Sequence, residues 1–425
     1  SREGANRYYA DMPDIFQSAM DKFAKETGRQ YHLFDYYGSD DAERVIVIMG
    51  SGAAVARETV EHLVKQGEKV GLLIVRLFRP FDIKRFMGAL PGTVKRIAVL
   101  DRCKDPAAIC EPLCADVREA LNGRDITVVG GRYGLSSKDF TPAMVKGVYD
   151  ELKKLAPKDS FTTGIEDDVT FTSLAYDPAF DTENPKTVRC LFYGLGSDGT
   201  VGANKNSIKI IGDHTDMYAQ AYFAYDSKKS GGVTVSHLRF GHTPIHSTYL
   251  ISKANFVACH NPSYITKYDM VEDLVDGGTF LLNCPWSAEE LEERLPGKVK
   301  RFIAQHNIQF YTIDGIDIGR KLGLGTRINT VLQSAFFKLA KIIDEADAIK
   351  YMKDAATKSY GAKGDKVVKM NHDAIDEGAK AVVKVDVPAS WANAADDATD
   401  AKAVGERKDL VDFVNNILIP ANAQR

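Results

Sequence analysis

Short apolar runs alternate with amphipathic segments along the first part of the chain. Residues 44–49 (RVIVIM), 70–77, 96–100 and 126–129 are rich in β-branched and aliphatic residues, which predicts buried strands. The segment at 8–30 has apolar residues at helical spacing, with Pro13 placed in its first turn, and a second helix runs through Val60 and Leu63. Strands that alternate with helices predict a parallel α/β sheet, whose working residues lie at the carboxyl ends of the strands.

A second unit of the same kind begins at residues 188–193 (VRCLFY). Further strands are predicted at 207–211, 232–238, 256–258, 279–282 and 309–312, and one short strand at 169–171. Residues 326–349 and 365–384 have the spacing of amphipathic helices. The fold class is therefore predicted as α/β, with two tandem three-layer α/β domains and mainly parallel sheets.

The length of the chain supports this division, because one core rarely grows beyond about 300 residues and the chain has 425. The aperiodic stretch at 153–187, with its prolines and charges, is interpreted as a linker. The expected domains are then 1–152 and 188–390, and residues 391–425 form a C-terminal extension. Because there is no initiator Met and neither end has a recognisable terminal motif, we expect the sequence to be an internal piece of a longer polypeptide.

Charge and composition exclude several classes of partner. Lys plus Arg number 55 against 58 Asp plus Glu, so no basic field is present to attract nucleic acid. No apolar run reaches the roughly 18 residues that a membrane-spanning helix needs, so no membrane partner is expected. The six cysteines follow neither a disulfide rhythm nor a metal-ligand spacing. We therefore expect reduced structural thiols, a cytoplasmic protein and no metal site.

Two glycine motifs follow predicted strands. Gly50-Ser51-Gly52 lacks the third glycine of a dinucleotide fingerprint and is interpreted as a tight turn. The segment at 194–205 (GLGSDGTVGANK) has a complete GxGxxG and a fourth glycine, which can leave backbone N–H groups open to a phosphate. An acidic residue at the expected distance is missing, and the Walker pattern fails at Lys205. The motif therefore favours phosphate binding over a nicotinamide site or a P-loop.

Two further clusters have mainly structural interpretations. The polar segment at 225–232 contains Lys228 and Lys229, which are either solvated or placed to meet an anion held by the preceding glycine loop. His237, His242, His246 and His260 fall within 24 residues, but Pro244 breaks the helix that a zinc motif would need. No carboxylate pair, Ser-His-Asp order or nucleophile elbow appears, so no catalytic residue is assigned.

Several longer segments carry a resemblance to a known family. These segments are 31–38 (YHLFDYYG), 42–47 (AERVIV), 67–71 (GEKVG), 75–81 (VRLFRPF), 97–102 (IAVLDR), 130–135 (GGRYGL), 138–142 (KDFTP), 194–205, 225–232 (YDSKKSGG), 257–264 (VACHNPSY) and 267–270 (KYDM). They resemble the second and third domains of pyruvate:ferredoxin (flavodoxin) oxidoreductases. The second domain is similar to the C-terminal domain of transketolases, and the third to the γ subunit of multi-chain relatives.

This resemblance implies a reaction and a set of cofactors. The family converts pyruvate and CoA to acetyl-CoA and CO2 by means of thiamine diphosphate. Its electrons pass through [4Fe-4S] clusters to ferredoxin or flavodoxin. The chain lacks the family's GDG…NN thiamine–Mg²⁺ motif and its CxxCxxCxxxCP cluster motif. We therefore expect scaffold and part of the CoA site here, with thiamine diphosphate, Mg²⁺ and the clusters only in the full-length enzyme.

The resemblance also assigns residues to the CoA site. Carried over by position, the cradle for the CoA phosphates includes Gly194, Gly196, Ser197, Asp198, Gly199, Thr200, Gly202 and Lys205. Lys228 and Lys229 are the candidate phosphate partners.

Three readings of the chain's role remain open. In the first, it is an inactive piece of an oxidoreductase whose remaining domains lie on the same polypeptide, with the full enzyme a homodimer. In the second, it is a stand-alone scaffold and CoA-binding subunit of a multi-chain 2-oxoacid oxidoreductase. The third is a nicotinamide-dependent dehydrogenase built on the glycine motif at 194–199.

Overall fold

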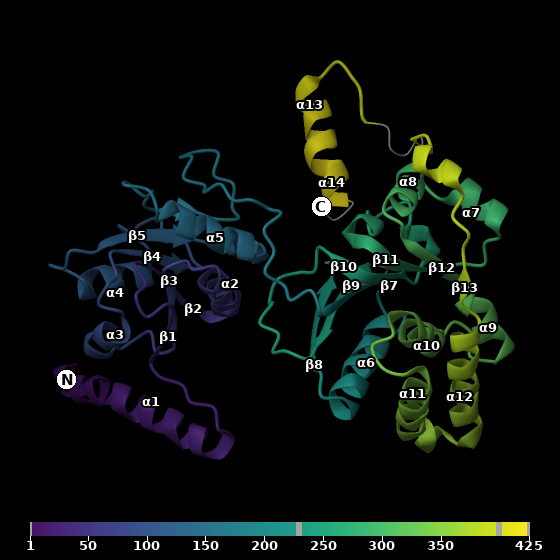
Figure 1. Ribbon diagram of the computed structural model, residues 1–425, viewed down its shortest axis with the longest axis horizontal. Helices are drawn as coiled ribbons and strands as arrows, with labels where there is room; N and C mark the ends of the chain where they lie inside the picture. The colour runs from purple at the N-terminus through teal and green to yellow at the C-terminus, as the bar shows by residue number, and fades with distance from the viewer. Residues whose placement is uncertain (1, 227–231, 397–401, 423–425) are drawn as a thin grey trace. The chain divides into compact units, whose positions relative to one another are not determined.

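The computed structural model describes residues 2–226, 232–396 and 402–422, which form two compact units. Unit 1 contains residues up to Asn184 together with His246–Tyr249, and unit 2 contains Pro185–Ile245 and the chain from Leu250 onward. Each unit is built around one sheet with helices on both faces (Figure 1). The predicted α/β class is confirmed, whereas the predicted domain limits stay a prediction.

The sheet of unit 1 has six strands in the order β1-β3-β2-β4-β5-β6. All neighbours are parallel except β1, which runs antiparallel to β3. The strands are β1 (Phe34–Gly38), β2 (Arg44–Met49), β3 (Val70–Val75), β4 (Arg96–Asp101), β5 (Thr127–Arg132) and β6 (Phe161–Thr162). The helices are α1 (Asn6–Thr27), α2 (Ala53–Lys65), α3 (Ile83–Ala89), α4 (Pro112–Ala120) and α5 (Pro142–Glu151).

Alternation along the strands produces two cores in unit 1. On β2, Ile46 and Ile48 pack with α2 and α5, whereas Val45 and Val47 pack on the opposite face with α3 and α4. Successive side chains of a strand point to opposite faces, so a strand covered on both sides must be apolar throughout. Coverage of both faces of the sheet therefore explains the continuous apolar runs of the sequence.

The sheet of unit 2 has seven strands in the order β13-β12-β11-β10-β7-β9-β8. Strands β7, β10, β11 and β12 are parallel, and β8, β9 and β13 are paired antiparallel. The strands are β7 (Val188–Leu195), β8 (Tyr218–Tyr225), β9 (Val233–Gly241), β10 (Ala254–Cys259), β11 (Leu274–Asn283), β12 (Gln309–Ile313) and β13 (Val383–Lys384). The helices are α6 (Thr200–His214), α7 (Ala288–Arg294), α8 (Gly297–Gln305), α9 (Gly315–Lys321), α10 (Asn329–Ala340), α11 (Glu345–Tyr360), α12 (Asp365–Lys380), α13 (Lys408–Phe413) and α14 (Ile419–Asn422).

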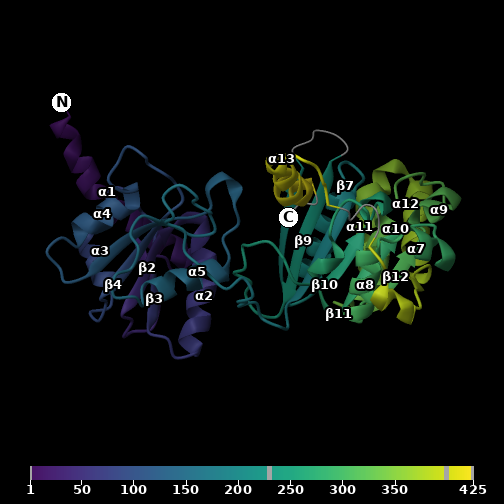
Figure 2. The same ribbon diagram turned by 90° about the horizontal axis from the view of Figure 1, so that it is seen from above.

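The helices of unit 2 divide between the two faces of its sheet. Helices α7 and α8 cover one face, and α6, α10, α11 and α12 cover the other (Figures 1 and 2). Strand β7 serves both cores, because Leu191 and Tyr193 face the first group and Cys190 and Phe192 face the second. This three-layer arrangement places the carboxyl ends of β7, β10, β11 and β12 along one edge.

Four local expectations are wrong. Residues 207–211 are part of α6, where Ala203, Ser207 and Ile210 are buried at helical spacing that the β-branched residues concealed. Residues 326–349 form two helices, because Lys341 takes a left-handed conformation after α10. Pro13 lies inside α1 and not in its first turn, and residues 169–171 form no strand.

Candidate functional site

The complete glycine motif forms the turn between β7 and α6. Its backbone bends sharply, since Ser197 and Gly199 have φ values of 73° and 93° in the left-handed region. Gly194 allows close packing, because a Cβ atom there would lie 2.4 Å from the Thr200 hydroxyl. The glycines at 194 and 199 therefore let the chain leave a buried strand and begin a helix within a few residues.

The Asp198 carboxylate binds the turn itself. One of its oxygens accepts the Leu195 N–H at 2.8 Å, and the other accepts the Thr200 N–H at 2.7 Å. These bonds fasten the end of β7 to the start of α6. In this structure Asp198 shapes the loop, and its direct contact with a phosphate stays a prediction.

Other N–H groups of the turn remain open. Within the described part of the chain, the N–H groups of Ser197, Gly199, Val201 and Gly202 have no hydrogen-bond partner. No heavy atom lies within 4 Å of a Cβ built at Gly202, so the surface there is uncovered. The positive end of the α6 dipole points to the same place. Open N–H groups at a helix N-terminus can bind an oxyanion.

A buried hydrogen-bond chain supports the turn from the neighbouring strands. Thr200 Oγ1 lies 2.8 Å from His260 Nδ1, and the backbone N–H of His260 donates to the Tyr193 carbonyl. Asn283 donates to the His260 carbonyl at 2.8 Å and accepts the Gly315 N–H at 3.0 Å. The chain of bonds therefore crosses the carboxyl ends of β7, β10, β11 and β12. Burial lowers the pKa of His260 to about 4, so its ring is neutral at physiological pH.

The predicted lysines are in different situations. Lys205 is exposed on α6, and its ammonium group lies 5.5 Å from the centre of the Phe223 ring on β8. Lys228 and Lys229 lie outside the described residues. The chain just after them is described, and the Gly232 carbonyl accepts the Gly196 N–H at 2.8 Å. Gly232, the first described residue after the lysine pair, therefore lies directly beside the glycine turn.

Three residues that contribute to the site were not identified as such from the sequence. His260 had only a general structural interpretation, and Asn283 and Asn329 had none. Asn329 begins α10 and lies 3.1 Å from a Cβ built at Gly199, so it flanks the turn. All three come from separate segments, and only the fold brings them together.

Side chains of the protein occupy the space beside the incomplete motif Gly50-Ser51-Gly52 at Gly52. A Cβ atom at Gly52 would lie 2.7 Å from the Tyr133 hydroxyl and 2.8 Å from Ile48. Tyr133 is buried, and its hydroxyl lies over the turn and donates to the Met49 carbonyl. The interpretation of this motif as a tight turn agrees with the structure.

The histidines that are close in sequence differ in burial. His237 and His260 are buried, whereas His242 and His246 are not. Over the described ranges, no three His, Cys, Asp or Glu side chains gather as ligands of a metal ion would. The six cysteines are free thiols. In the part of the chain that the structure covers, no helix combines the length and apolar character needed to cross a bilayer.

Two family models match the chain. Residues 42–145 match "Pyruvate:ferredoxin oxidoreductase core domain II", and residues 189–381 match "Pyruvate ferredoxin/flavodoxin oxidoreductase". The first match covers all the strands of unit 1 except β1 and β6, and the second begins within β7 and includes the glycine turn.

Curated relatives match the whole chain. The pyruvate:ferredoxin oxidoreductase of Moorella thermoacetica is 56% identical over 425 residues, and the pyruvate-flavodoxin oxidoreductase of Enterobacter agglomerans is 52% identical over 426. The chain spans 36% of the length of each. The crystal structure of pyruvate oxidoreductase subunit PORC from Thermotoga maritima aligns with 47% of this chain and 99% of its own, at 16% identity and a TM-score of 0.39. From the family models and the relatives together, the chain belongs to the pyruvate:ferredoxin/flavodoxin oxidoreductase family.

Proposed function

We propose that this chain supplies scaffold and part of the CoA site of an enzyme that converts pyruvate and CoA to acetyl-CoA and CO2. Two electrons leave this reaction for ferredoxin or flavodoxin. In this proposal unit 1 is the scaffold, and the glycine turn of unit 2 binds phosphate groups of CoA. The curated relatives are single chains much longer than this one, which favours a role as part of a larger polypeptide over a stand-alone subunit.

One observation carries the proposal: the open N–H groups of Ser197, Gly199, Val201 and Gly202 at the start of α6, within the described residues. CoA carries a diphosphate and a 3′-phosphate, and phosphate oxygens accept N–H groups at a helix N-terminus. We propose Lys228 and Lys229 as partners of the same anion, because they precede Gly232 closely in the sequence and the Gly232 carbonyl accepts the Gly196 N–H. Asp198 keeps the turn in shape, and the other N–H groups are the donors.

The remaining cofactors and partners are proposed for the full-length enzyme. Thiamine diphosphate would supply the carbanion chemistry, together with Mg²⁺, and [4Fe-4S] clusters would carry the electrons. Other domains of the longer polypeptide would hold these groups. The full enzyme is proposed to be a cytoplasmic homodimer. The chain by itself is expected to be colourless and unable to reduce a viologen dye with pyruvate.

Titration calorimetry tests the CoA site. CoA should bind the chain, and dephospho-CoA, which lacks the 3′-phosphate, should bind more weakly. Raising the salt concentration from about 20 mM to about 300 mM should weaken CoA binding, because screening acts on exposed charges. The double variant Lys228→Ala/Lys229→Ala should lose about tenfold in affinity at low salt, on the order of 1 kcal/mol for two exposed charge contacts.

Lys209→Ala provides a matched control, since this lysine is exposed on the same helix, about three turns from the glycine loop. It should leave CoA affinity unchanged. Equal affinities of the wild type and the double lysine variant would remove the lysines from the site. If CoA fails to bind at millimolar concentration in low salt, the CoA proposal is wrong for this chain.

A further inference from the structure

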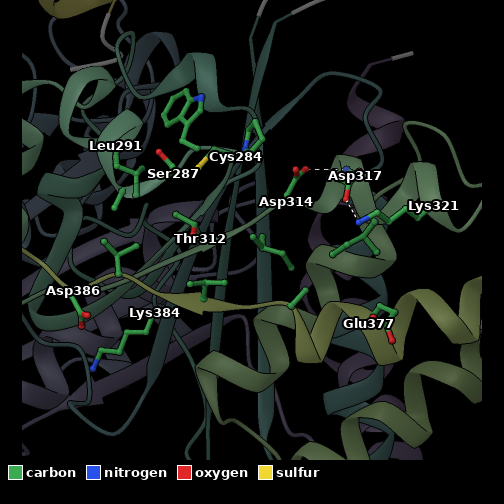
Figure 3. A pocket seen from close by; sticks show the side chains of 18 of the residues that line it. Cys284, Ser287, Leu291, Thr312, Asp314, Asp317, Lys321, Glu377, Lys384 and Asp386 are labelled. Atoms are coloured by element: carbon green, nitrogen blue, oxygen red, sulfur yellow. Dashed lines mark hydrogen bonds and ion pairs between the residues drawn. The ribbon is translucent and has the colours of Figure 1, made fainter.

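A separate cavity of about 770 Å³ lies in unit 2, beyond the carboxyl ends of β11 and β12 (Figure 3). Its volume is in the range of small-molecule sites, and open α/β sheets bind ligands at this edge. It shares no residue with the glycine turn after β7. Its walls come from four segments: 284–288 with Leu291, 312–314, α9 with Leu322, and the end of α12 with 383–386. We call it the β11–β12 cavity.

The interior of the β11–β12 cavity is apolar with one unpaired hydroxyl. Trp286, Leu291 and Ile318 line it, and Val383, which also lines it, is 58% exposed. Thr312 also lines it and is only 8% exposed, and within the described residues its hydroxyl has no hydrogen-bond partner. A hydroxyl that lines a cavity and has no partner in the protein can form a hydrogen bond with a ligand, and this bond would orient the ligand.

The neighbouring thiol gives no charge to the interior. Cys284 is 4% exposed, and burial raises its pKa to about 11, so the thiol is protonated near neutral pH. The Cys284 thiol and the Trp286 indole are both uncharged groups of the wall, and the Arg294 guanidinium lies 5.6 Å from the centre of the indole ring.

The rim of the cavity is acidic. Four carboxylates line it against two ammonium groups: Asp314, Asp317, Glu377 and Asp386 against Lys321 and Lys384. Asp317 and Lys321 form an ion pair at 2.6 Å, and Figure 3 shows them together on the side away from Leu291. Glu377 is paired with Lys380 at 3.4 Å, so Asp314 and Asp386 supply the excess negative charge. This charge opposes phosphates and carboxylates, in contrast to the open N–H groups of the glycine turn.

We propose that the β11–β12 cavity is a second ligand site, which takes a neutral or cationic aromatic molecule with one group that hydrogen-bonds to Thr312. The ring packs against Trp286 and the aliphatic walls, and the acidic rim selects the charge. The site is distinct from the proposed CoA phosphate site in both position and charge preference.

Three probes that share the indole ring and differ in charge test the proposal by calorimetry. Indole is neutral, tryptamine is a cation and indole-3-acetate is an anion. Indole and tryptamine should bind the full chain with Kd near 1 mM, the order expected for fragments of this size. Indole-3-acetate should bind at least about tenfold more weakly than tryptamine. Equal binding of all three probes, or no binding at about 10 mM, would overturn the proposal.

Variants connect the binding to this cavity. Ala288→Trp places a large ring at an exposed, cavity-lining position and should abolish binding of indole and tryptamine. Thr312→Val should weaken both about three- to tenfold. Thr279→Val is the matched control, because Thr279 lies on β11 three residues before Leu282, which pairs with Thr312, and therefore points to the other face of the sheet. Circular dichroism should show all three variants folded. If Ala288→Trp and Thr312→Val bind indole like wild type, the cavity is not the site.

Discussion

The two glycine turns of the molecule have similar positions in their sheets but different surroundings. Each follows a buried strand of a parallel sheet and opens a helix, β2 and α2 in unit 1 and β7 and α6 in unit 2. At Gly52 the space beside the backbone is filled by Tyr133 and Ile48. At Gly202, in the first turn of α6, the space beside the backbone is empty, and four N–H groups nearby have no partner within the described residues.

A glycine motif specifies the local path of the backbone and does not by itself specify a ligand site. In both turns glycine solves a steric problem, because a Cβ atom would clash at Gly52 and at Gly194. Only the second turn combines this with a carboxylate, that of Asp198, which holds the loop from inside. A ligand site therefore depends on what the rest of the fold places over the turn.

Lowering the pH should produce the largest difference between the stabilities of unit 1 and unit 2. The second turn is supported by His260, and burial lowers the pKa values of His260 and His237 to about 4. The folded state then binds fewer protons than the unfolded state, whose histidine pKa is about 6.5. The contribution of the two histidines to the free energy of unfolding of unit 2 is fully present above about pH 6.5. It is lost as the pH drops toward 4, by up to about 3 kcal/mol per histidine. Burial raises the pKa of Tyr133, which supports the first turn, so that ring stays neutral.

Urea unfolding at pH 7 and pH 4.5 measures this difference. Both tryptophans, Trp286 and Trp391, belong to unit 2, so tryptophan fluorescence reports on that unit. Hydrogen-exchange mass spectrometry of peptides from β2 and β4 follows unit 1. The fluorescence midpoint should fall with acid, and His260→Gln should reduce the fall. A midpoint that stays constant between the two pH values would contradict the burial argument.

Alanine at the third residue of the first turn should have the next largest effect. Gly52→Ala should lower the free energy of unfolding of unit 1 by about 1–3 kcal/mol, because its Cβ overlaps two buried side chains. Gly202→Ala in the open turn should stabilise unit 2 by about 0.5–1 kcal/mol, since it lies in a helix with no atom nearby. Urea titrations followed by the same two probes compare the variants. Similar losses in both would show that the second turn is also filled.

Removing the charge of Asp198 should have a smaller effect. Asp198→Asn keeps an oxygen that can accept one of the two N–H groups, so unit 2 should lose about 1–2 kcal/mol of stability. Asp198→Ala should lose more, because both bonds disappear. Fluorescence-monitored unfolding would decide, and an alanine variant as stable as wild type would mean that the carboxylate does not hold the loop.

The sequence predicted the strands of this fold better than it predicted the site. Runs such as 44–49 and 188–193 are apolar on both faces because the sheets are covered on both faces, and this pattern is local. The β-branched residues of 207–211 predict a strand, because they outweigh a helical spacing that includes the polar Ser207. The bond between Thr200 and His260 joins positions 60 residues apart, so no local pattern could show it. Lys205 was placed in the cradle by position, but its described contact is with Phe223.

In the proposed function, the turn at 194–202 binds phosphates of CoA and the turn at 50–52 does not. A glycine-selective ¹⁵N spectrum tests it directly, with Gly50, Gly52, Gly199 and Gly202 identified by alanine variants. Addition of CoA should shift the Gly199 and Gly202 amides and leave Gly50 and Gly52 unchanged, and pantetheine, which lacks phosphate, should shift none of the four. Shifts at Gly50 and Gly52, or CoA saturation without any change at Gly199 and Gly202, would contradict the account.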